Sequence, residues 1–302
     1  MTKHIVKIFG ERNTGTRAAI RLVRQVEGVS LRVRARETPP VDTATEVAIE
    51  GAMKGHWKRL YLQAMADDLA APEAADDPWK HAVPRLTPAM RAARVKTLIL
   101  VRDPYSWLLG LARRPYHIKG PNAESLEDFV ARPWLTEGRE GMPAVVASPV
   151  DLWRAKTSGG MIYRDTAIAA GLACEILRFE DFLADPAGSV IAALQRMDVD
   201  CADLRPARTN TKRGEADLSR LQAYYAAEAW RVRFSRETVA RVNARLDAET
   251  VAAAGYALRD PADFAEAVPA AERAAMRREM ENLTTPTHGG GSDRETGAAA
   301  AT

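Results

Sequence analysis

The segment from Gly10 to Arg17 constrains the fold most, because a strand pattern precedes it directly and a helix pattern follows it. Residues 5–9 are mostly apolar and predict a buried strand. Apolar residues then recur with helical spacing at Ala18, Ala19, Leu22, Val23 and Val26. A strand that breaks at glycine and restarts as a helix directs several backbone N–H groups and the positive end of the helix dipole to one point. We therefore expect an anionic group to bind at this loop.

The loop matches only the first part of the Walker A pattern. Gly10 and Gly15 lie five residues apart, as the pattern requires. Thr16 occupies the position of the Walker lysine, and Arg17 that of the Ser or Thr that holds Mg²⁺. These differences disfavour an ordinary ATP or GTP hydrolase, and a tight strand-to-helix turn without a ligand is the alternative.

Composition places the chain among globular proteins. Its 302 residues, 46% of them hydrophobic and 27% charged, suffice for a core in one large domain or two small ones. The net charge of +3, with cations and anions interspersed, argues against a surface for nucleic acid. Cys174 and Cys201 show neither metal-ligand spacing nor a disulfide framework. With no leader pattern and no run long enough for a membrane span, we expect a cytoplasmic protein.

A second buried strand is predicted over residues 95–101, which are apolar and rich in β-branched residues. A continuous apolar run indicates burial on both faces, as in a parallel strand covered by helices. The run ends at Arg102, and Pro104 begins a helix. Arg102 is therefore expected at the carboxyl end of a central strand, where open α/β sheets bind ligands.

Further patterns complete the organisation of the chain. Strands are predicted over 29–35 and 173–179, and a helix over 148–170 that is interrupted at Ser158-Gly159-Gly160. The segments 37–55 and 66–78 have the composition of surface insertions. Helix starts are marked by Thr87-Pro88, Ser148-Pro149, Asp185-Pro186 and Ser235. Five residues with ring side chains have two interpretations, an aromatic wall that lines the site of the acceptor substrate (the acceptor wall) or part of the core. They are Trp57, Tyr61, Tyr116, His117 and Trp134.

This order predicts an α/β fold of the P-loop type: a three-layer sandwich with a central, mainly parallel sheet flanked by helices. We expect residues 1–260 to form this domain and residues 261–302 to form a weakly helical and then disordered tail.

Several segments together resemble the sulfotransferases that use 3′-phosphoadenosine 5′-phosphosulfate. The stretch Arg12-Asn13-Thr14-Gly15-Thr16-Arg17 resembles their 5′-phosphosulfate loop, in the Gly-Thr-Arg form of the heparan sulfotransferases. Lys80-His81, followed by Pro84, resembles their second motif, and Arg102-Asp103-Pro104-Tyr105 resembles their Arg-Asn-Pro segment. Residues 177–181 are similar to their Tyr-Glu-Asp segment, and Lys212-Arg213-Gly214 to their basic-glycine loop. The matches follow the order of the family over about residues 3 to 260.

The resemblance implies a donor, 3′-phosphoadenosine 5′-phosphosulfate, and a hydroxyl or amine acceptor on a small molecule or carbohydrate, with no metal. The residues suit such a polyanion, because the loop from Arg12 to Arg17 would bind the 5′ end through its N–H groups and hydroxyls. The 3′-phosphate would be met by Arg102 and by the loop Lys212-Arg213-Gly214. An ion pair is the alternative for Arg102, and a solvated basic loop for Lys212 and Arg213.

His81 is the candidate catalytic base, since imidazole titrates near neutral pH and the residue is expected after a strand beside the loop. It stands 21 residues before Arg102, as in the family. Lys80 is expected to stabilise the bridging oxygen or to lie in solvent.

Two positions depart from the family pattern. Asn13 stands where many members have the lysine assigned to the leaving group, and we expect Arg12, or else Arg17 or Lys80, to take that role. Gly110 stands where members often have a hydroxyl residue, for which Ser106 is the substitute. A small-molecule P-loop kinase and a non-catalytic, anion-binding homologue remain the alternative functions.

Overall fold

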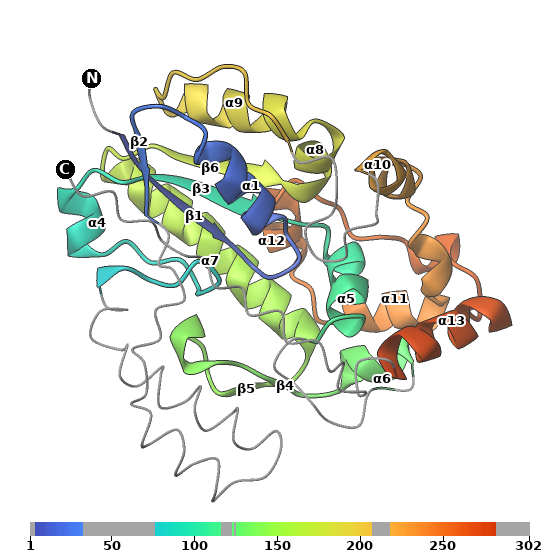
Figure 1. Ribbon diagram of the computed structural model, residues 1–302. Coiled ribbons are helices and arrows are strands. Elements are labelled where there is room, and N and C mark those ends of the chain that lie inside the picture. Colours follow the sequence, from blue (N-terminus) through green and yellow to red (C-terminus); the bar gives the residue numbers. More distant parts are fainter. Residues whose placement is uncertain (1–3, 33–75, 116–122, 124, 207–217, 282–302) are drawn as a thin grey trace, which may run out of the picture.

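The computed structural model describes residues 4–32, 76–115, 123, 125–206 and 218–281 (Figure 1). The predicted insertion at 37–55 and the loop Lys212-Arg213-Gly214 lie outside these ranges. So do four aromatic candidates for the acceptor wall, namely Trp57, Tyr61, Tyr116 and His117.

Four parallel strands form the central sheet, in the order β2-β1-β3-β6. They are β1 (His4–Gly10), β2 (Val29–Leu31), β3 (Lys96–Val101) and β6 (Cys174–Arg178). Because β1 pairs with β3, with Gly10 opposite Leu100, the loop after β1 and the residues after β3 leave the sheet at the same edge. The prediction that Arg102 shares an edge with the Gly10 loop depends on this pairing, which the sequence did not determine.

Both faces of the sheet are covered by helices, as the continuous apolar strands predict. Alternate residues of β1 and β3, such as Ile8 and Leu98, pack with α1 (Thr16–Val23) and α9 (Pro186–Arg196). The intervening residues, such as Phe9 and Ile99, pack with α7 (Pro149–Ala169) and α4 (Pro88–Ala92) on the other face. Figure 1 shows the sheet between these two helical layers. The predicted three-layer α/β fold is confirmed.

Side-chain caps fix the starts of several helices, and those at Thr87, Ser148, Asp185 and Ser235 confirm the predicted helix starts. Asp103 accepts from the Ser106 N–H at 2.8 Å and begins α5 (Pro104–Ala112). Ser235 begins α11 (Arg236–Asn243) in the same way. The other caps are Thr87 for α4, Ser148 for α7 and Asp185 for α9.

The predicted interruption of a helix at Ser158-Gly159-Gly160 is wrong, because α7 runs without a break through these residues. Packing explains Gly159. A Cβ at Gly159 would lie 2.4 Å from Val83 Cγ1, and one at Gly160 would lie 3.4 Å from Ile99 Cγ2. Gly159 allows α7 to lie close to the segment around Val83, whereas a Cβ at Gly160 would make only an ordinary contact with the sheet.

A second cluster of buried residues lies beside the sheet and joins α5 and α6 (Leu126–Ala131) to the C-terminal helices (Figure 1). These helices are α11, α12 (Ala248–Ala253) and α13 (Ala270–Glu281). Met276 and Met280 of α13 are buried in this cluster, so residues up to 280 pack against the domain that was predicted to end at 260. Trp134, a candidate for the acceptor wall, is also buried here and is a core residue.

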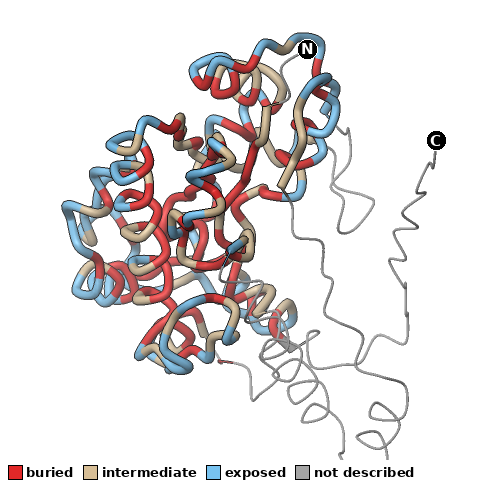
Figure 2. Tube along the Cα trace, turned by 90° about the vertical axis from the view of Figure 1, so that its left-hand side faces the viewer, coloured by how far each residue is buried: buried red, intermediate tan, exposed pale blue. Residues whose placement is uncertain are grey.

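The remaining elements are short. A hairpin of β4 (Trp134–Leu135) and β5 (Val145–Val146) carries the 3-10 turn Gly138–Glu140 between its strands. Helices α8 (Phe179–Ala184) and α10 (Leu218–Ala226) lie near the carboxyl end of β6. Figure 2 shows buried residues gathered at the centre of the molecule and exposed residues on its outer segments. None of the helices in the described ranges has the length and apolar character that crossing a bilayer requires.

Candidate functional site

The loop after β1 is closely packed at its two glycines. A Cβ on Gly10 would lie 2.8 Å from the Leu100 carbonyl oxygen. Gly15 has a left-handed φ of 86° and lies against the ring of Phe182, which a Cβ would approach to 3.1 Å. Glycine is therefore required at both positions, for steric and conformational reasons that do not depend on a ligand.

Asn13 lies at the tip of the loop with a left-handed φ of 67°. Asparagine is enriched several-fold in this region among residues other than glycine. Its carbonyl oxygen accepts a hydrogen bond from Arg102. The departure from the lysine of the family thus has a conformational reason.

The first turn of α1 has neither a side-chain cap nor an acidic residue, and its N-cap is Gly15. The first N–H groups of a helix lack acceptors within the helix, and the helix dipole makes this end positive. Thr16 is buried here, and Arg17 is exposed. The Thr14 hydroxyl donates to the Glu11 carbonyl at 2.6 Å, which fixes the loop internally.

Arg102 lies at the carboxyl end of β3, directly beside this loop. Its Nη1 donates to the Asn13 carbonyl at 2.8 Å, and its Nε donates to Ser106 Oγ at 3.0 Å. Its Nη2 donates to the Ser106 carbonyl and to the Tyr225 hydroxyl, at 2.8 and 2.7 Å. The guanidinium also lies over the rings of Phe179 and Tyr225, at 4.5 and 4.9 Å. These bonds within the described residues use four of the five N–H groups that an arginine has.

Gly110, the second departure from the family pattern, faces the same guanidinium. A Cβ at this position would lie 3.3 Å from Arg102 Nη1. Ser106, expected to replace the missing hydroxyl, does contact Arg102. Phe179 belongs to the predicted segment 177–181, although its contact with Arg102 was not predicted, and Tyr225 was missed because no local pattern indicated that α10 approaches the end of β3.

His81 lies beside the loop in a turn, and the strand that we expected to precede it is absent from residues 76–87. The Gly10 N–H donates to the Lys80 carbonyl at 3.0 Å, which holds this turn and Lys80 against the end of β1. His81 Nδ1 lies 2.6 Å from the Gly10 carbonyl oxygen. Since a carbonyl only accepts, Nδ1 carries the proton and Nε2 carries the lone pair.

The environment of His81 keeps its ring neutral. Desolvation is the largest cause that lowers the pKa of His81 well below 6.5, and the positive charges of Arg12 and Lys80 act in the same direction. A neutral ring with its lone pair on Nε2 is the form that accepts a proton.

Arg12, the first choice for the leaving-group cation, lies in a cluster of three carboxylates, Glu11, Glu137 and Glu140. Its Nη1 lies 3.2 Å from Glu11 and 2.9 Å from Glu140, and its Nη2 lies 2.9 Å from Glu137. Burial opposes the charge of Arg12, but these carboxylates raise its pKa above the usual value. Arg12 therefore carries a permanent charge that is matched by nearby anions.

Two further cations balance the carboxylate cluster. Lys156 on α7 pairs with Glu11 at 3.1 Å and with Glu140 at 2.7 Å, and Arg139 pairs with Glu137 at 2.8 Å. Burial alone would raise the pKa of Glu11, but Lys156 and Arg12 hold it below its usual value. Sequence reasoning missed Lys156, Glu137 and Glu140, since their meeting depends on how α7 and the hairpin pack beside the loop.

Trp79 covers this cluster. The Arg139 guanidinium lies 3.8 Å from the centre of its ring and that of Arg12 lies 4.9 Å away. The His81 ring meets Trp79 edge to face at 4.8 Å. Trp79 thereby connects the predicted base to the predicted phosphate loop.

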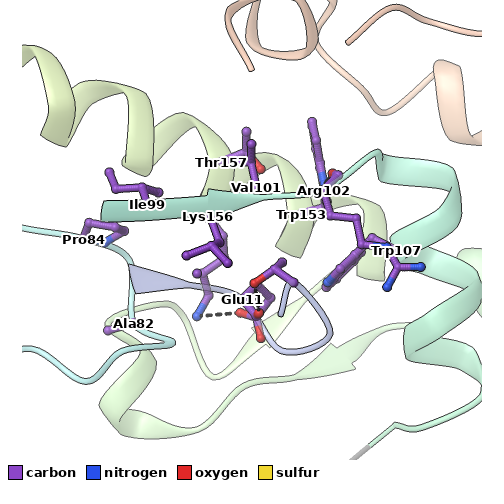
Figure 3. A pocket seen from close by; sticks show the side chains of 13 residues that line it. Glu11, Ala82, Pro84, Ile99, Val101, Arg102, Trp107, Trp153, Lys156 and Thr157 are labelled. Atoms are coloured by element: carbon purple, nitrogen blue, oxygen red, sulfur yellow. Dashed lines mark hydrogen bonds and ion pairs between the residues drawn. The ribbon is translucent and has the colours of Figure 1, made fainter. Parts of the chain in front are cut away.

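A cavity of about 20 Å³ lies behind the loop, between β3 and α7, which is room for about one water molecule. Figure 3 shows Glu11, Lys156 and Arg102 around it, together with Trp107 and Trp153. Trp107 donates to the Arg12 carbonyl at 2.8 Å, and Trp153 donates to the Arg102 carbonyl at 2.9 Å. The two indoles fix the backbone of the loop and of the strand end. Within the described ranges, no three His, Cys, Asp or Glu side chains are arranged to hold a metal ion.

A search of protein-family models and a search of curated proteins both find no match. Among solved structures, the chain is similar to a sulfotransferase from Alicyclobacillus acidocaldarius, with a TM-score of 0.36 and 16% sequence identity. The similarity covers 81% of this chain and 96% of that one. A similarity of this degree is too low to assign a function.

Proposed function

We propose that this protein is a sulfotransferase that moves a sulfuryl group from 3′-phosphoadenosine 5′-phosphosulfate to a hydroxyl or amine acceptor. One observation carries the proposal: Arg102 after β3 donates directly to the Asn13 carbonyl of the loop after β1, at 2.8 Å, and His81 contacts the start of that loop. The loop after β1 and Arg102, which suit anions, and His81, which suits a proton, thus lie at one edge of the sheet.

In this proposal, the N–H groups at the start of α1 bind the 5′-phosphosulfate. Arg102 stands at the side of the 3′-phosphate, where its planar guanidinium suits a phosphate oxygen. Arg17, exposed on the first turn of α1, and Lys80, held beside the loop, are better placed than Arg12 to meet charge on the leaving group, because Arg12 faces three carboxylates. Lys212-Arg213-Gly214 keep the role at the 3′-phosphate that the motif implies.

The transfer step needs a base and charge stabilisation. The acceptor oxygen or nitrogen forms a bond to sulfur, while the bond from sulfur to the bridging phosphate oxygen breaks. The bridging oxygen leaves with the electron pair on adenosine 3′,5′-bisphosphate, and the acceptor proton moves to Nε2 of His81. The hydrogen bond from Nδ1 to Gly10 presents Nε2 for this purpose. Most of the rate enhancement then comes from positioning and from electrostatic stabilisation of the leaving oxygens.

Binding of the donor is tested by isothermal titration with adenosine 3′,5′-bisphosphate and with ATP. We expect the bisphosphate to bind at micromolar concentrations and ATP to bind more weakly. The proposal is wrong if ATP binds while the bisphosphate shows no binding at tens of micromolar. Consumption of ATP that depends on Mg²⁺ would instead favour a kinase.

Catalysis is tested with His81→Ala. We expect bisphosphate binding close to wild type and turnover reduced by roughly a hundredfold or more, the usual scale for loss of a general base. His4→Ala is the matched control, since His4 lies at the opposite end of β1 and should leave turnover unchanged. Equal turnover of His81→Ala and wild type would remove His81 from the mechanism.

The pairing of Arg12 with carboxylates favours a second candidate, a protein that keeps the anion site without catalysis. In that case the bisphosphate binds, and no acceptor in a broad panel of phenols, sugars and amines is sulfated.

A further inference from the structure

Lys156 lies on the buried face of α7 and directs its ammonium toward the loop after β1 (Figure 3). Three groups from three separate segments surround this ammonium: the His81 carbonyl, a Glu11 carboxylate oxygen at 3.1 Å and a Glu140 carboxylate oxygen at 2.7 Å. The contact with the carbonyl is a hydrogen bond, and the contacts with the two carboxylates are ion pairs. The ammonium is therefore held between three segments of the site.

Lys156 and the loop hold the His81 turn from two sides. The His81 backbone carbonyl accepts from Lys156, and its ring donates to the Gly10 carbonyl. Two residues later, the Val83 N–H donates to the Glu140 carbonyl at 2.9 Å. Glu140 is itself paired with Lys156, so the ammonium connects the turn, the loop and the hairpin at one point.

The charge of Lys156 also acts on Glu11 and on His81. It is the largest of the favourable charges that keep Glu11 ionised, and it adds to the positive field that keeps His81 neutral. Trp79 and the Gly10 carbonyl contact the His81 ring. The positive charges of Arg12, Lys80 and Lys156 act on the pKa of that ring. A neutral side chain at position 156 would leave Glu11 and Glu140 less compensated and remove one cation near His81.

We propose that Lys156 is a positioning residue for the reaction, which sets the place of His81 relative to the phosphate loop through the His81 carbonyl and Glu11. The inference rests on the proposed function, since His81 is the base of that proposal. Lys156 itself does not touch the reacting atoms in this scheme. It acts through His81, which touches the reacting atoms, and through Glu11, which lies at the start of the loop.

The first test is the variant Lys156→Met, compared with Lys156→Arg and with Lys96→Met. Lys96 on β3 is the matched control, because it donates to the carbonyls of Met197 and Asp198, at the far end of the same strand from Arg102. We expect Lys156→Met to lower kcat at least tenfold with a change of less than about threefold in the Kd of adenosine 3′,5′-bisphosphate. Lys156→Arg should restore part of kcat, and Lys96→Met should change thermal stability alone.

The second test needs no activity and follows the ring of His81 by NMR titration, with His81→Gln to assign its resonances. We expect the midpoint for His81 to move to higher pH in Lys156→Met, and to stay at the wild-type position in Lys96→Met. If Lys156→Met does not fold, Lys156→Gln serves in the titration, since its amide can still donate to the His81 carbonyl without the charge.

Three results separate the two proposals. Absence of bisphosphate binding by the wild-type protein overturns the proposed sulfotransferase, whatever the variants do. Binding and turnover by the wild type, with unchanged kcat and an unchanged His81 midpoint in Lys156→Met, overturns the role of Lys156. A fall in kcat that Lys96→Met reproduces to the same degree would likewise show that Lys156 contributes to stability only.

Discussion

Asp103 follows Arg102 directly and provides a test of the electrostatics at the end of β3. Its carboxylate is 4% exposed, and its Oδ1 accepts from the Ser106 N–H to begin α5. Burial, as the largest cause, and the nearby charge of Glu180 raise the pKa of Asp103 from 3.8 to about 6, although the Ser106 N–H and Arg259 oppose the shift. The folded protein therefore binds this proton more tightly than the unfolded chain does.

The sign of the effect on stability follows from this difference. Between pH 3.8 and about 6 the folded state holds the proton while the unfolded state has lost it, so stability falls as the pH rises through this interval. A shift of about 2 pH units corresponds to roughly 3 kcal/mol at most, at about 1.4 kcal/mol per unit. Asp103→Asn removes the titration and keeps a carbonyl oxygen for the Ser106 N–H.

We expect the free energy of unfolding of Asp103→Asn, relative to wild type, to rise by about 2–3 kcal/mol between pH 4 and pH 7.5. The assay is urea unfolding at intervals of half a pH unit, and the difference between the two proteins cancels the other titrating groups. Asp185→Asn is the matched control, because Asp185 caps α9 in the same way but is exposed. A difference that stays flat with pH, or that grows toward acid pH, would refute the assignment.

Two glycines lead to further predictions. Gly110→Ala places a methyl group 3.3 Å from Arg102 Nη1 and should displace the guanidinium. We expect this change to weaken adenosine 3′,5′-bisphosphate binding by about tenfold, or ~1.4 kcal/mol. An unchanged Kd by calorimetry would contradict the placement of Arg102 at the nucleotide. Gly159→Ala places a methyl group 2.4 Å from Val83 Cγ1 and should destabilise the protein by about 1–3 kcal/mol in urea unfolding. The neighbouring Gly160→Ala, with an ordinary contact of 3.4 Å to Ile99, should be neutral or stabilising, and equal effects of the two changes would exclude overpacking.

The sequence predicts well those features that depend on neighbours in the chain. The strand, loop and helix around Gly10 follow from periodicity and glycine spacing, and the caps at Thr87, Ser148 and Asp185 follow from the residue types that satisfy the first N–H groups of a helix. The placement of Arg102 at the carboxyl edge of the sheet follows from the position of β3, once that strand is identified.

Features that depend on packing between distant segments were not predictable. Arg12 and Glu140 are separated by 128 positions, and their ion pair exists because the hairpin folds back onto the loop. Lys156 and His81 are separated by 75 positions and meet because Gly159 allows α7 to lie close to the segment around Val83. Helix propensity alone disfavours the two glycines and leads to the wrong prediction of an interruption, and the contact with Val83 explains only Gly159.

The two departures from the sulfotransferase pattern, Asn13 and Gly110, meet at a single side chain. The carbonyl of Asn13 accepts from Nη1 of Arg102, and the left-handed backbone that asparagine tolerates is what turns this carbonyl toward the arginine. Gly110 leaves room for the same Nη1, which lies 3.3 Å from the place that a Cβ would occupy. A larger residue at 110 would push the guanidinium away from the loop, and the bond to Asn13 would be lost. The two positions therefore form one structural feature, in which Arg102 lies against the loop after β1 and is held there by Ser106 and Tyr225.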